Sequence, residues 1–183
     1  MGELTKLPTV LVLASGRGER FAASGGQVHK LQALLGSKKI IDWTLDAVRA
    51  SGLPYHVEDA GHPGMGDSIA AAVRATQDAA GWLVLPADLP LVNPTTLQAV
   101  AQALTQLHEG QRTVYPEYAG QRGHPVGFAR SCLQDLLKLQ GNKGAASVLT
   151  AQAATKLIVH DAGCVVDIDT LADLQRAQNM LST

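Results

Sequence analysis

The residues best suited to chemistry lie in a glycine-rich, basic segment that follows the first apolar run of the chain. Gly16 and Gly18 allow the backbone to turn sharply and to expose its amide hydrogens. Arg17, Arg20 and Lys30 bring three positive charges to the same segment. Backbone amides, guanidinium groups and an ammonium group together match the needs of a polyphosphate. The pattern therefore predicts a loop that binds a nucleoside triphosphate, and a flexible surface loop with incidental charge is the alternative.

Two common phosphate-binding motifs do not fit this segment. The third glycine of a dinucleotide fingerprint is absent, and no GKS or GKT sequence follows as in a P-loop. The prediction of a triphosphate loop therefore depends on its glycines and charges, and on what the rest of the chain adds to them.

Three aspartates form the second group of residues that can do chemistry. Asp88 ends an apolar run typical of a buried strand, and Asp167 and Asp169 follow a later strand, just before the last expected helix. Hard cations such as Mg²⁺ prefer carboxylate oxygens and usually keep water molecules and substrate phosphates as further ligands. Carboxylates from two separate strands therefore predict one Mg²⁺ site above the triphosphate. The alternatives are a turn-forming role for Asp88 and helix capping by Asp169.

One histidine stands out by its neighbours. His124 lies between Gly123 and Pro125, which makes it a candidate binding residue, with an ordinary turn histidine as the alternative. The other histidines lack the spacing of a metal site, and no role is predicted for them: His29, His56, His62, His108 and His160.

Length and composition limit the classes of protein that this chain can belong to. Its 183 residues suffice for one domain with a real core, so a single domain is expected over residues 1–183. The formal net charge of −1 and the lack of a basic stripe argue against a nucleic-acid partner. No apolar run approaches the ~20 residues of a membrane span, and the first residues lack the apolar core of a secretion signal. We therefore expect no membrane partner and a cytoplasmic location.

The chain has two cysteines, Cys132 and Cys164. They fit neither a disulfide framework nor a Cys/His metal pattern. Both are predicted to be buried small hydrophobic residues.

Expected strands and helices alternate along the chain. This order predicts an α/β fold of three layers, with helices on both faces of a mostly parallel sheet. Ligands of such sheets bind at the carboxyl ends of the strands. One helix is expected to be capped by Asn93, with Pro94 at its first position, and another by Asp67 or Ser68. Strands are expected at 9–14, 55–58, 82–86, 113–118, 125–129, 156–160 and 165–168, and helices at 40–51, 67–80, 94–108, 131–139, 144–152 and 170–181.

The sequence LASGRGER at 13–20, followed by Lys30, resembles the LAAGxGxR…K signature of the nucleotidyltransferases with a MobA-like domain. Four later segments resemble other motifs of that family, in the family's order: GMGDSI at 64–69, LPADLPLV at 85–92, GHPV at 123–126 and DIDTLADL at 167–174. The GHPV segment is typical of the molybdenum cofactor cytidylyltransferase branch. The resemblance implies a Rossmann-like fold and transfer of CMP from CTP to a phosphorylated acceptor, molybdopterin, with release of pyrophosphate.

The resemblance also implies which residues carry the reaction. Arg20, Lys30 and Asp88 would be catalytic, stabilising the triphosphate while a phosphate oxygen of the acceptor attacks the α-phosphorus. Asp88 and Asp167 would hold Mg²⁺, and Asp169 is the less favoured ligand.

The same resemblance assigns the two substrates to different segments. Gly123, His124 and Pro125 would lie at the second substrate, whose phosphate His124 and Arg122 can meet. The nucleotide-binding residues would be Leu13, Ala14, Ser15, Gly16, Arg17, Gly18, Arg20, Lys30, Ser68 and Asp88.

Three departures from the family pattern matter. Residues 141–146 read GNKGAA where the branch usually carries GDxGAR, so an acid and an arginine near the second substrate are missing. Only about a dozen residues separate Gly52 from the GMGDSI segment, so the sheet is expected to be one βα unit shorter than is usual. An insertion-like AASGGQVH stretch precedes Lys30, which makes Arg20 the better-supported phosphate ligand.

The sequence leaves open which base the bound nucleotide carries and whether the protein has transferase activity. Ser15 matches neither the alanine that accompanies cytosine nor the glycine that accompanies guanine. One alternative is a transferase that uses GTP or another nucleotide with another phosphorylated acceptor. The other is a nucleotide-binding regulatory module without transferase activity.

Overall fold

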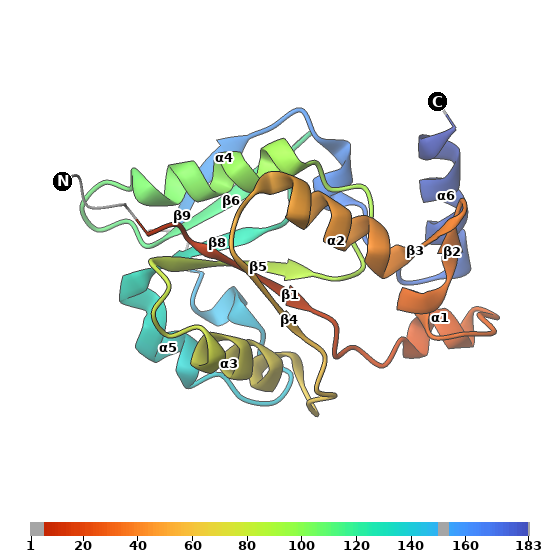
Figure 1. Cartoon of the computed structure of the whole chain (residues 1–183), viewed down its shortest axis with the longest axis horizontal. Helices are drawn as coiled ribbons and strands as arrows, with labels where there is room; N and C mark the ends of the chain where they lie inside the picture. The colour runs from red at the N-terminus through yellow and green to blue at the C-terminus, as the bar shows by residue number, and fades with distance from the viewer. Residues whose placement is uncertain (1–5, 150–153, 183) are drawn as a thin grey trace.

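The computed structural model describes residues 6–149 and 154–182. Its centre is a seven-stranded sheet with the strand order β4-β1-β5-β8-β6-β7, and β9 also pairs with β6. Helices α2 and α4 cover one face and α3 and α5 the other (Figure 1), which confirms the Rossmann-like three-layer α/β fold. The strands are β1 (Thr9–Leu13), β2 (Leu34–Leu35), β3 (Lys38–Lys39), β4 (Tyr55–Glu58), β5 (Gly81–Pro86), β6 (Thr113–Tyr118), β7 (Gln121–Arg122), β8 (Val126–Ala129) and β9 (Ala154–Ile158). The α-helices are α1 (Glu19–Ala23), α2 (Ile40–Ser51), α3 (Met65–Ala75), α4 (Pro94–Thr105), α5 (Leu133–Leu137) and α6 (Leu171–Leu181).

The first strand is buried on both faces, as its continuous apolar sequence predicts. Val10 and Val12 pack into the core under α2 and α4, whereas Leu11 packs into the core under α3 and α5. This alternation follows from the period of two residues in a strand. Because β4, β1 and β5 are parallel neighbours, the loops after them meet at one edge of the sheet.

The other half of the sheet is mixed. Strands β6 and β9 are parallel, but β8 lies antiparallel between β5 and β6, and the short β7 is antiparallel to β6. The chain passes from β6 to β8 through a few residues, which is far shorter than the crossover that a parallel pair needs. A single strand, β4, lies between α2 and α3, as the short spacing there predicts.

Helix α3 begins earlier than the sequence indicates. Its first residue is Met65 and its N-cap is Gly64, so the prediction that Asp67 or Ser68 caps this helix is wrong. Both side chains lie in the first turn, where Ser68 Oγ donates to the Gly64 carbonyl at 3.2 Å. Asp67 instead accepts a hydrogen bond at 3.0 Å from the backbone amide of Gly141, and so ties a distant loop to the helix start.

The starts of α4 and α6 follow capping rules closely. Asn93 caps α4 through its side chain and Pro94 follows, as predicted. Thr170 and Asp173 form a reciprocal capping box at the start of α6. Asp169 is therefore not the cap of the last helix, and its carboxylate is available for other contacts.

Residues 165–168 do not form the predicted strand. The chain instead crosses the ends of the sheet, where the backbone amide of Ile168 donates to the carbonyl of Asp88 at 3.0 Å. Gly163 packs directly on the loop after β5, since a Cβ atom on Gly163 would lie 1.7 Å from the carbonyl oxygen of Leu91. These contacts hold the segment against the loop after β5 and exclude it from the sheet.

Two of the predicted helices are shorter than expected. The helix predicted at 131–139 is a 3₁₀ turn that continues into α5. Of the helix predicted at 144–152, the described part has only a 3₁₀ turn at Ala145–Ser147, and residues 150–152 lie outside the described residues. Such short helices contain few intrahelical hydrogen bonds, so their bounds depend on packing more than on local sequence.

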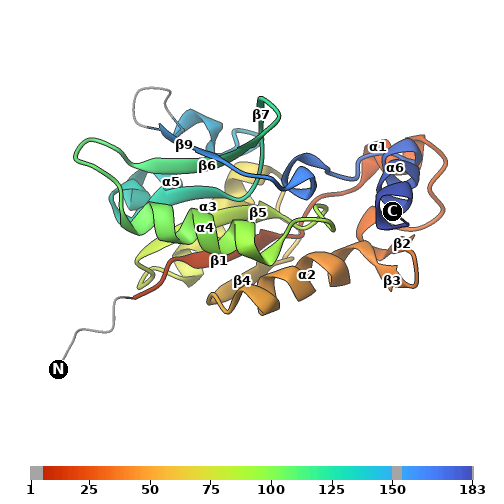
Figure 2. The ribbon, with the colours of Figure 1, turned by 90° about the horizontal axis from the view of Figure 1, so that it is seen from above.

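Three short elements gather beyond the carboxyl ends of β1 and β5: α1, the β2–β3 hairpin and α6 (Figure 2). The backbone amide of Leu171 donates to Ser24 Oγ at 3.0 Å, and that of Gly36 donates to Gln178 Oε1 at 2.7 Å. These contacts join the first and last parts of the chain above the sheet edge. None of these three elements except α6 is expected from the sequence.

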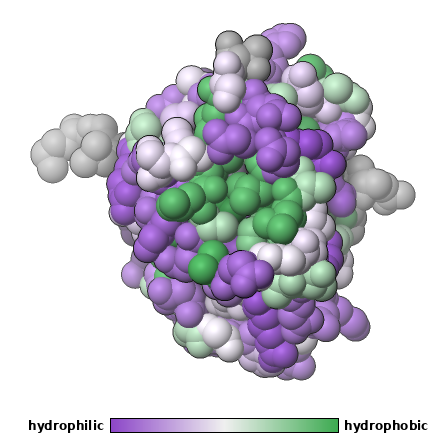
Figure 3. Space-filling view, turned by 90° about the vertical axis from the view of Figure 1, so that its right-hand side faces the viewer, coloured by the Kyte–Doolittle hydropathy of each residue, from purple (hydrophilic) through white to green (hydrophobic). Residues whose placement is uncertain are grey.

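The outer surface of this end is partly apolar. Figure 3 looks onto it and shows an apolar area bordered by hydrophilic residues. Leu34 of β2 and Leu171 and Met180 of α6 are among the exposed large apolar residues. Within residues 6–149 and 154–182, the structure has no helix of the length and hydropathy needed to span a membrane.

Candidate active site

A cavity of about 780 Å³ opens at the carboxyl ends of β1, β4 and β5. Most of the residues that the sequence singles out meet there, although they come from five separate segments. Ala14, Gly123 and Pro125 are not among its lining residues. Those that line it are Leu13, Ser15, Gly16, Arg17, Gly18, Arg20, Lys30, Ser68, Asp88, His124, Asp167 and Asp169.

Lys30 lies at the centre of the charged part of the cavity. Its Nζ is 2.5 Å from Asp88 Oδ2 and 3.0 Å from Asp169 Oδ1, and only 12% of its side chain is exposed. Burial lowers the pKa of Lys30, but the charges and hydrogen bonds of the two carboxylates outweigh burial and raise it above its ordinary value. Lys30 is therefore a charged ammonium group that reaches the site despite the insertion before it.

His29 explains how the chain brings Lys30 into place. Its Nδ1 accepts a hydrogen bond from the amide of Leu31 at 3.3 Å, so the proton is on Nε2, which lies 2.7 Å from the carbonyl oxygen of Gly16. This imidazole joins the glycine-rich loop to the start of the lysine turn. The sequence assigned His29 no role, because its partners are backbone groups that no side-chain spacing reveals.

Arg20 occupies a different environment from Lys30. Its Nη1 lies 2.8 Å from Asp169 Oδ2, but 76% of its side chain is exposed. Arg17 is similarly exposed and lies 3.8 Å from Glu19. The sequence ranks Arg20 above Lys30 as a phosphate ligand, whereas the structure buries Lys30 and leaves Arg20 at the rim.

The loop that carries Asp88 is held from two sides. Thr44 of α2 donates to the carbonyl of Ala87 at 2.8 Å, and the amide of Ile168 donates to the carbonyl of Asp88. Among the described residues, Asp88 Oδ1 is buried without a hydrogen-bond partner. An unpartnered buried carboxylate oxygen fits a cation ligand.

Asp167 adds a third carboxylate beside Asp88 and Asp169. Burial, together with the neighbouring charges of Asp169 and Asp88, raises the pKa of Asp167 above its ordinary value. Three carboxylates against the two cations Lys30 and Arg20 leave an excess of negative charge, which also fits a divalent cation. Within the described residues, no three His, Cys, Asp or Glu side chains form a ready-made metal site. A cation here would take its other ligands from water or from substrate phosphates.

His124 lines the cavity as a partly buried, neutral imidazole. Burial lowers its pKa from the ordinary value, although the charge of Asp88 and a hydrogen bond with the Val84 carbonyl oppose that shift. Its Nδ1 has no hydrogen-bond partner among the described residues. A Cβ at Gly123 would lie 2.5 Å from Cys164 Sγ, so glycine is needed there for the backbone to place His124.

The altered GNKGAA segment borders the same cavity. The amide of Gly66 donates to the Gly141 carbonyl at 2.8 Å, and a Cβ at Gly64 would lie 2.2 Å from that residue's backbone. Asn142 lines the cavity. The loop at 141–144 is thus fastened to the start of α3, next to Ser68.

His62 is a residue of the cavity wall to which the sequence assigned no role. It lies two residues before the GMGDSI segment, in the short loop after Glu58. Its place beside a family motif is the signal in the sequence that points to it.

The comparison with protein families agrees with this geometry. The profile of the MobA-like NTP transferase domain matches residues 46–156, so the chain belongs to this family of nucleotidyltransferases. The matched range contains Ser68, Asp88 and His124. The glycine-rich loop and Asp167 lie outside it, but they line the same cavity.

Solved structures share the fold over almost the whole chain. A nucleotidyl transferase from Methanothermobacter thermautotrophicus has a TM-score of 0.75 at 19% identity, covering 96% of this chain and 98% of its own. Molybdopterin-guanine dinucleotide biosynthesis protein A from Archaeoglobus fulgidus has a TM-score of 0.69 at 21% identity, covering 95% and 98%. Rv0371c from Mycobacterium tuberculosis H37Rv, solved in complex with manganese, has a TM-score of 0.70 at 23% identity, covering 94% and 98%. No curated protein matches the sequence.

Proposed function

We propose that this protein transfers a nucleoside monophosphate, preferably CMP from CTP, to a phosphorylated acceptor of the molybdopterin type, releasing pyrophosphate. The observation that carries the proposal is the pair formed by Lys30 and Asp88 in one cavity with the loop at Gly16 and Gly18. That cavity offers positive charge, the residues of the glycine-rich loop and an unpartnered carboxylate oxygen together. We further propose that residues 1–183 act as one domain, because segments inside and outside the family match contribute to this cavity.

The triphosphate would lie along the backbone of residues 15–18, between Lys30 and Arg20. A phosphate oxygen of the acceptor attacks the α-phosphorus, the bond from the α-phosphorus to the bridging oxygen breaks, and pyrophosphate leaves. The attacking phosphate is already an anion, so no protein nucleophile is needed. The residues supply positioning and charge stabilisation instead.

A divalent cation, proposed to be Mg²⁺, would neutralise charge on the triphosphate when bound. Asp88 and Asp167 would hold it. Asp169 is the less favoured ligand, because its two oxygens already face Lys30 Nζ at 3.0 Å and Arg20 Nη1 at 2.8 Å.

The acceptor would lie on the side of His124. A neutral imidazole has no charge with which to attract a phosphate, so its free Nδ1 would accept a hydrogen bond from an N–H or O–H group of the acceptor. Arg122, which also lines the cavity, would meet the acceptor phosphate. The preference for CTP rests on the GHPV segment alone.

Pyrophosphate release tests the proposal directly. Wild-type protein is incubated with CTP, GTP, ATP or UTP, a divalent cation and molybdopterin, and release is expected to be fastest with CTP. Release from another nucleotide would correct the donor, and release with another phosphorylated acceptor would correct the acceptor.

A nucleotide-binding regulatory module is the second candidate, because residues 141–146 lack the acid and the arginine of the acceptor segment. Its signature would be an increase in melting temperature with nucleotide, without pyrophosphate release from that nucleotide in the presence of any acceptor.

A further inference from the structure

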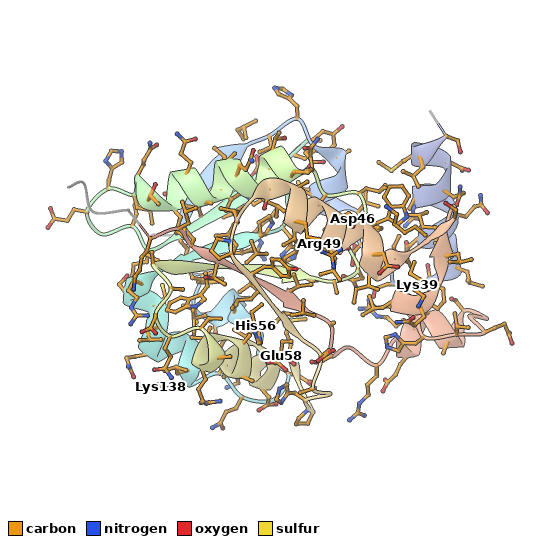
Figure 4. The ribbon with its side chains drawn as sticks, viewed as in Figure 1. Lys39, Asp46, Arg49, His56, Glu58 and Lys138 are labelled. Atoms are coloured by element: carbon orange, nitrogen blue, oxygen red, sulfur yellow. The ribbon has the colours of Figure 1, made fainter. Side chains whose placement is uncertain are left out.

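A carboxylate–imidazole pair lies beside the cavity, and its imidazole, His62, lines the cavity wall. Glu58, the last residue of β4, has a side chain that is only 9% exposed, and its Oε1 lies 3.0 Å from His62 Nε2. The amide of Ala60 donates to the same oxygen at 3.2 Å. The other oxygen, Oε2, lies 3.4 Å from His56 Nε2, and His56 and Glu58 lie near each other along β4 in Figure 4. His62 lines the cavity, whereas His56 does not.

Glu58 also braces the glycine-rich loop. Its backbone carbonyl accepts hydrogen bonds from the amide of Ala14 at 2.8 Å and from Ser15 Oγ at 3.1 Å. The hydroxyl hydrogen of Ser15 is therefore engaged by the protein itself, and only the oxygen of this hydroxyl can still accept a hydrogen bond.

The pair leaves one nitrogen of His62 for a ligand. Burial would raise the pKa of Glu58, but the Ala60 amide and the imidazoles of His56 and His62 lower it overall, so Glu58 is a carboxylate. A carboxylate only accepts hydrogen bonds, so the Nε2 of His62 donates to it, and in the neutral imidazole the lone pair is then on Nδ1.

His62 lies at the correct end of the cavity for a nucleoside. Strands β4 and β5 flank β1, so they are about 10 Å apart at the usual strand spacing. His62 follows β4 and Asp88 follows β5. With the phosphates at Lys30 and the aspartates, the nucleoside extends toward His62 and Ser68.

We propose that Glu58 positions His62 as a nucleoside-binding residue, whose Nδ1 accepts a hydrogen bond from an N–H or O–H group of the nucleoside. This inference rests on the proposed function, in that a nucleotide occupies the cavity. Two donors have the required chemistry: the amino group of cytosine and a ribose hydroxyl.

Equilibrium binding of CTP with Mg²⁺, without acceptor, tests the inference. His62→Ala is expected to weaken CTP binding about tenfold, the value of one hydrogen bond of about 1.4 kcal/mol. Glu58→Gln should weaken it about threefold, because His62 remains but is less firmly oriented. His62→Asn should recover most of the affinity, since its amide oxygen can stand where Nδ1 stood.

Two controls separate recognition from structural damage. His56→Ala removes the other imidazole bound to Glu58, and CTP affinity should stay unchanged because His56 is outside the cavity. Inorganic tripolyphosphate should bind all variants as it binds the wild type, because it lacks the nucleoside. A parallel loss of tripolyphosphate affinity in His62→Ala would overturn the inference, as would unchanged CTP affinity.

Two further ligands, UTP and a deoxyribose analogue of CTP, identify which group of the nucleoside donates the hydrogen bond to His62. If the amino group is the donor, His62→Ala weakens CTP but not UTP. If a ribose hydroxyl is the donor, it weakens CTP and UTP equally, and a deoxyribose analogue of CTP shows no loss. If the wild type releases pyrophosphate and His62→Ala binds CTP as tightly as the wild type does, this inference alone is overturned. A wild-type protein that binds no nucleotide would overturn the proposed function as well.

Discussion

The two ends of the cavity are built from different interactions. At one end, Lys30 lies between Asp88 and Asp169, so full charges face one another with little solvent around them. At the other end, Glu58 Oε1 holds the imidazole of His62 through a hydrogen bond with Nε2. Buried charges at short range act strongly and are weakly screened, which suits a triphosphate and its chemistry. An oriented imidazole offers direction with little net charge, which suits recognition. Under the proposed function, this difference would separate reaction from selection along the nucleotide.

The largest expected effect is at the charged end. Asp88→Asn removes the carboxylate that faces Lys30 and carries the unpartnered oxygen, so pyrophosphate release should fall about a thousandfold or more. Asp46→Asn is the matched control, because Asp46 lies on α2 and pairs with Lys38 and Arg49 outside the cavity. Both variants should keep the wild-type far-ultraviolet spectrum. Activity within tenfold of wild type in Asp88→Asn would sink the proposed metal role.

The two cations offer a comparison within the same end. Lys30→Met should lower kcat/KM about a hundredfold and Arg20→Met about tenfold, because solvent screens the exposed Arg20 more than the buried Lys30. Steady-state kinetics with CTP measures both. A larger loss in Arg20→Met than in Lys30→Met would make Arg20 the more important phosphate ligand, as the sequence predicts.

His124 tests whether the acceptor has its own side of the cavity. His124→Gln should raise the acceptor KM about tenfold and leave CTP affinity unchanged, since one hydrogen bond is lost. Burial keeps the pKa of His124 below its ordinary value, so the imidazole is neutral above about pH 6.5. The acceptor KM should accordingly be independent of pH from there upward, unless His124 acts as a cation. A loss of CTP affinity in His124→Gln would mean that His124 contacts the nucleotide and not the acceptor.

The smallest effect concerns the support of the charged end. Thr170→Ala removes the side-chain cap of α6, next to Asp169, and should lower the free energy of unfolding by about 1 kcal/mol. Urea denaturation measures this value. Thr105→Ala, at the exposed end of α4, serves as the control and should have little effect. A normal stability in Thr170→Ala would mean that the contacts of α6 with α1 and the hairpin suffice to hold it.

Rules of residue pattern and helix capping predicted the strands and helix starts that depend only on neighbouring residues. The continuous apolar runs of β1 and β5 predict buried strands, and the Asn93-Pro94 pair predicts the start of α4. The same rules failed at Asp67 and Ser68, where contact with the loop at 141–144 starts the helix earlier. They also failed at residues 165–168, which look like a strand but are held across the sheet edge by the hydrogen bond from the Ile168 amide to the Asp88 carbonyl.

The sequence by itself determined the α/β class, the family and the segments that line the cavity, because these depend on residue types, periodicity and motif order. Only the tertiary structure decided which of those residues face one another. Lys30 meets Asp88 and Asp169 across separations of 58 and 139 residues, and the insertion before Lys30 gave no sign of that. The partnership of Glu58 with His62, and of His29 with a backbone carbonyl, likewise depends on how β4 and the lysine turn pack against β1. Burial and orientation follow from packing between distant segments, which no local pattern encodes.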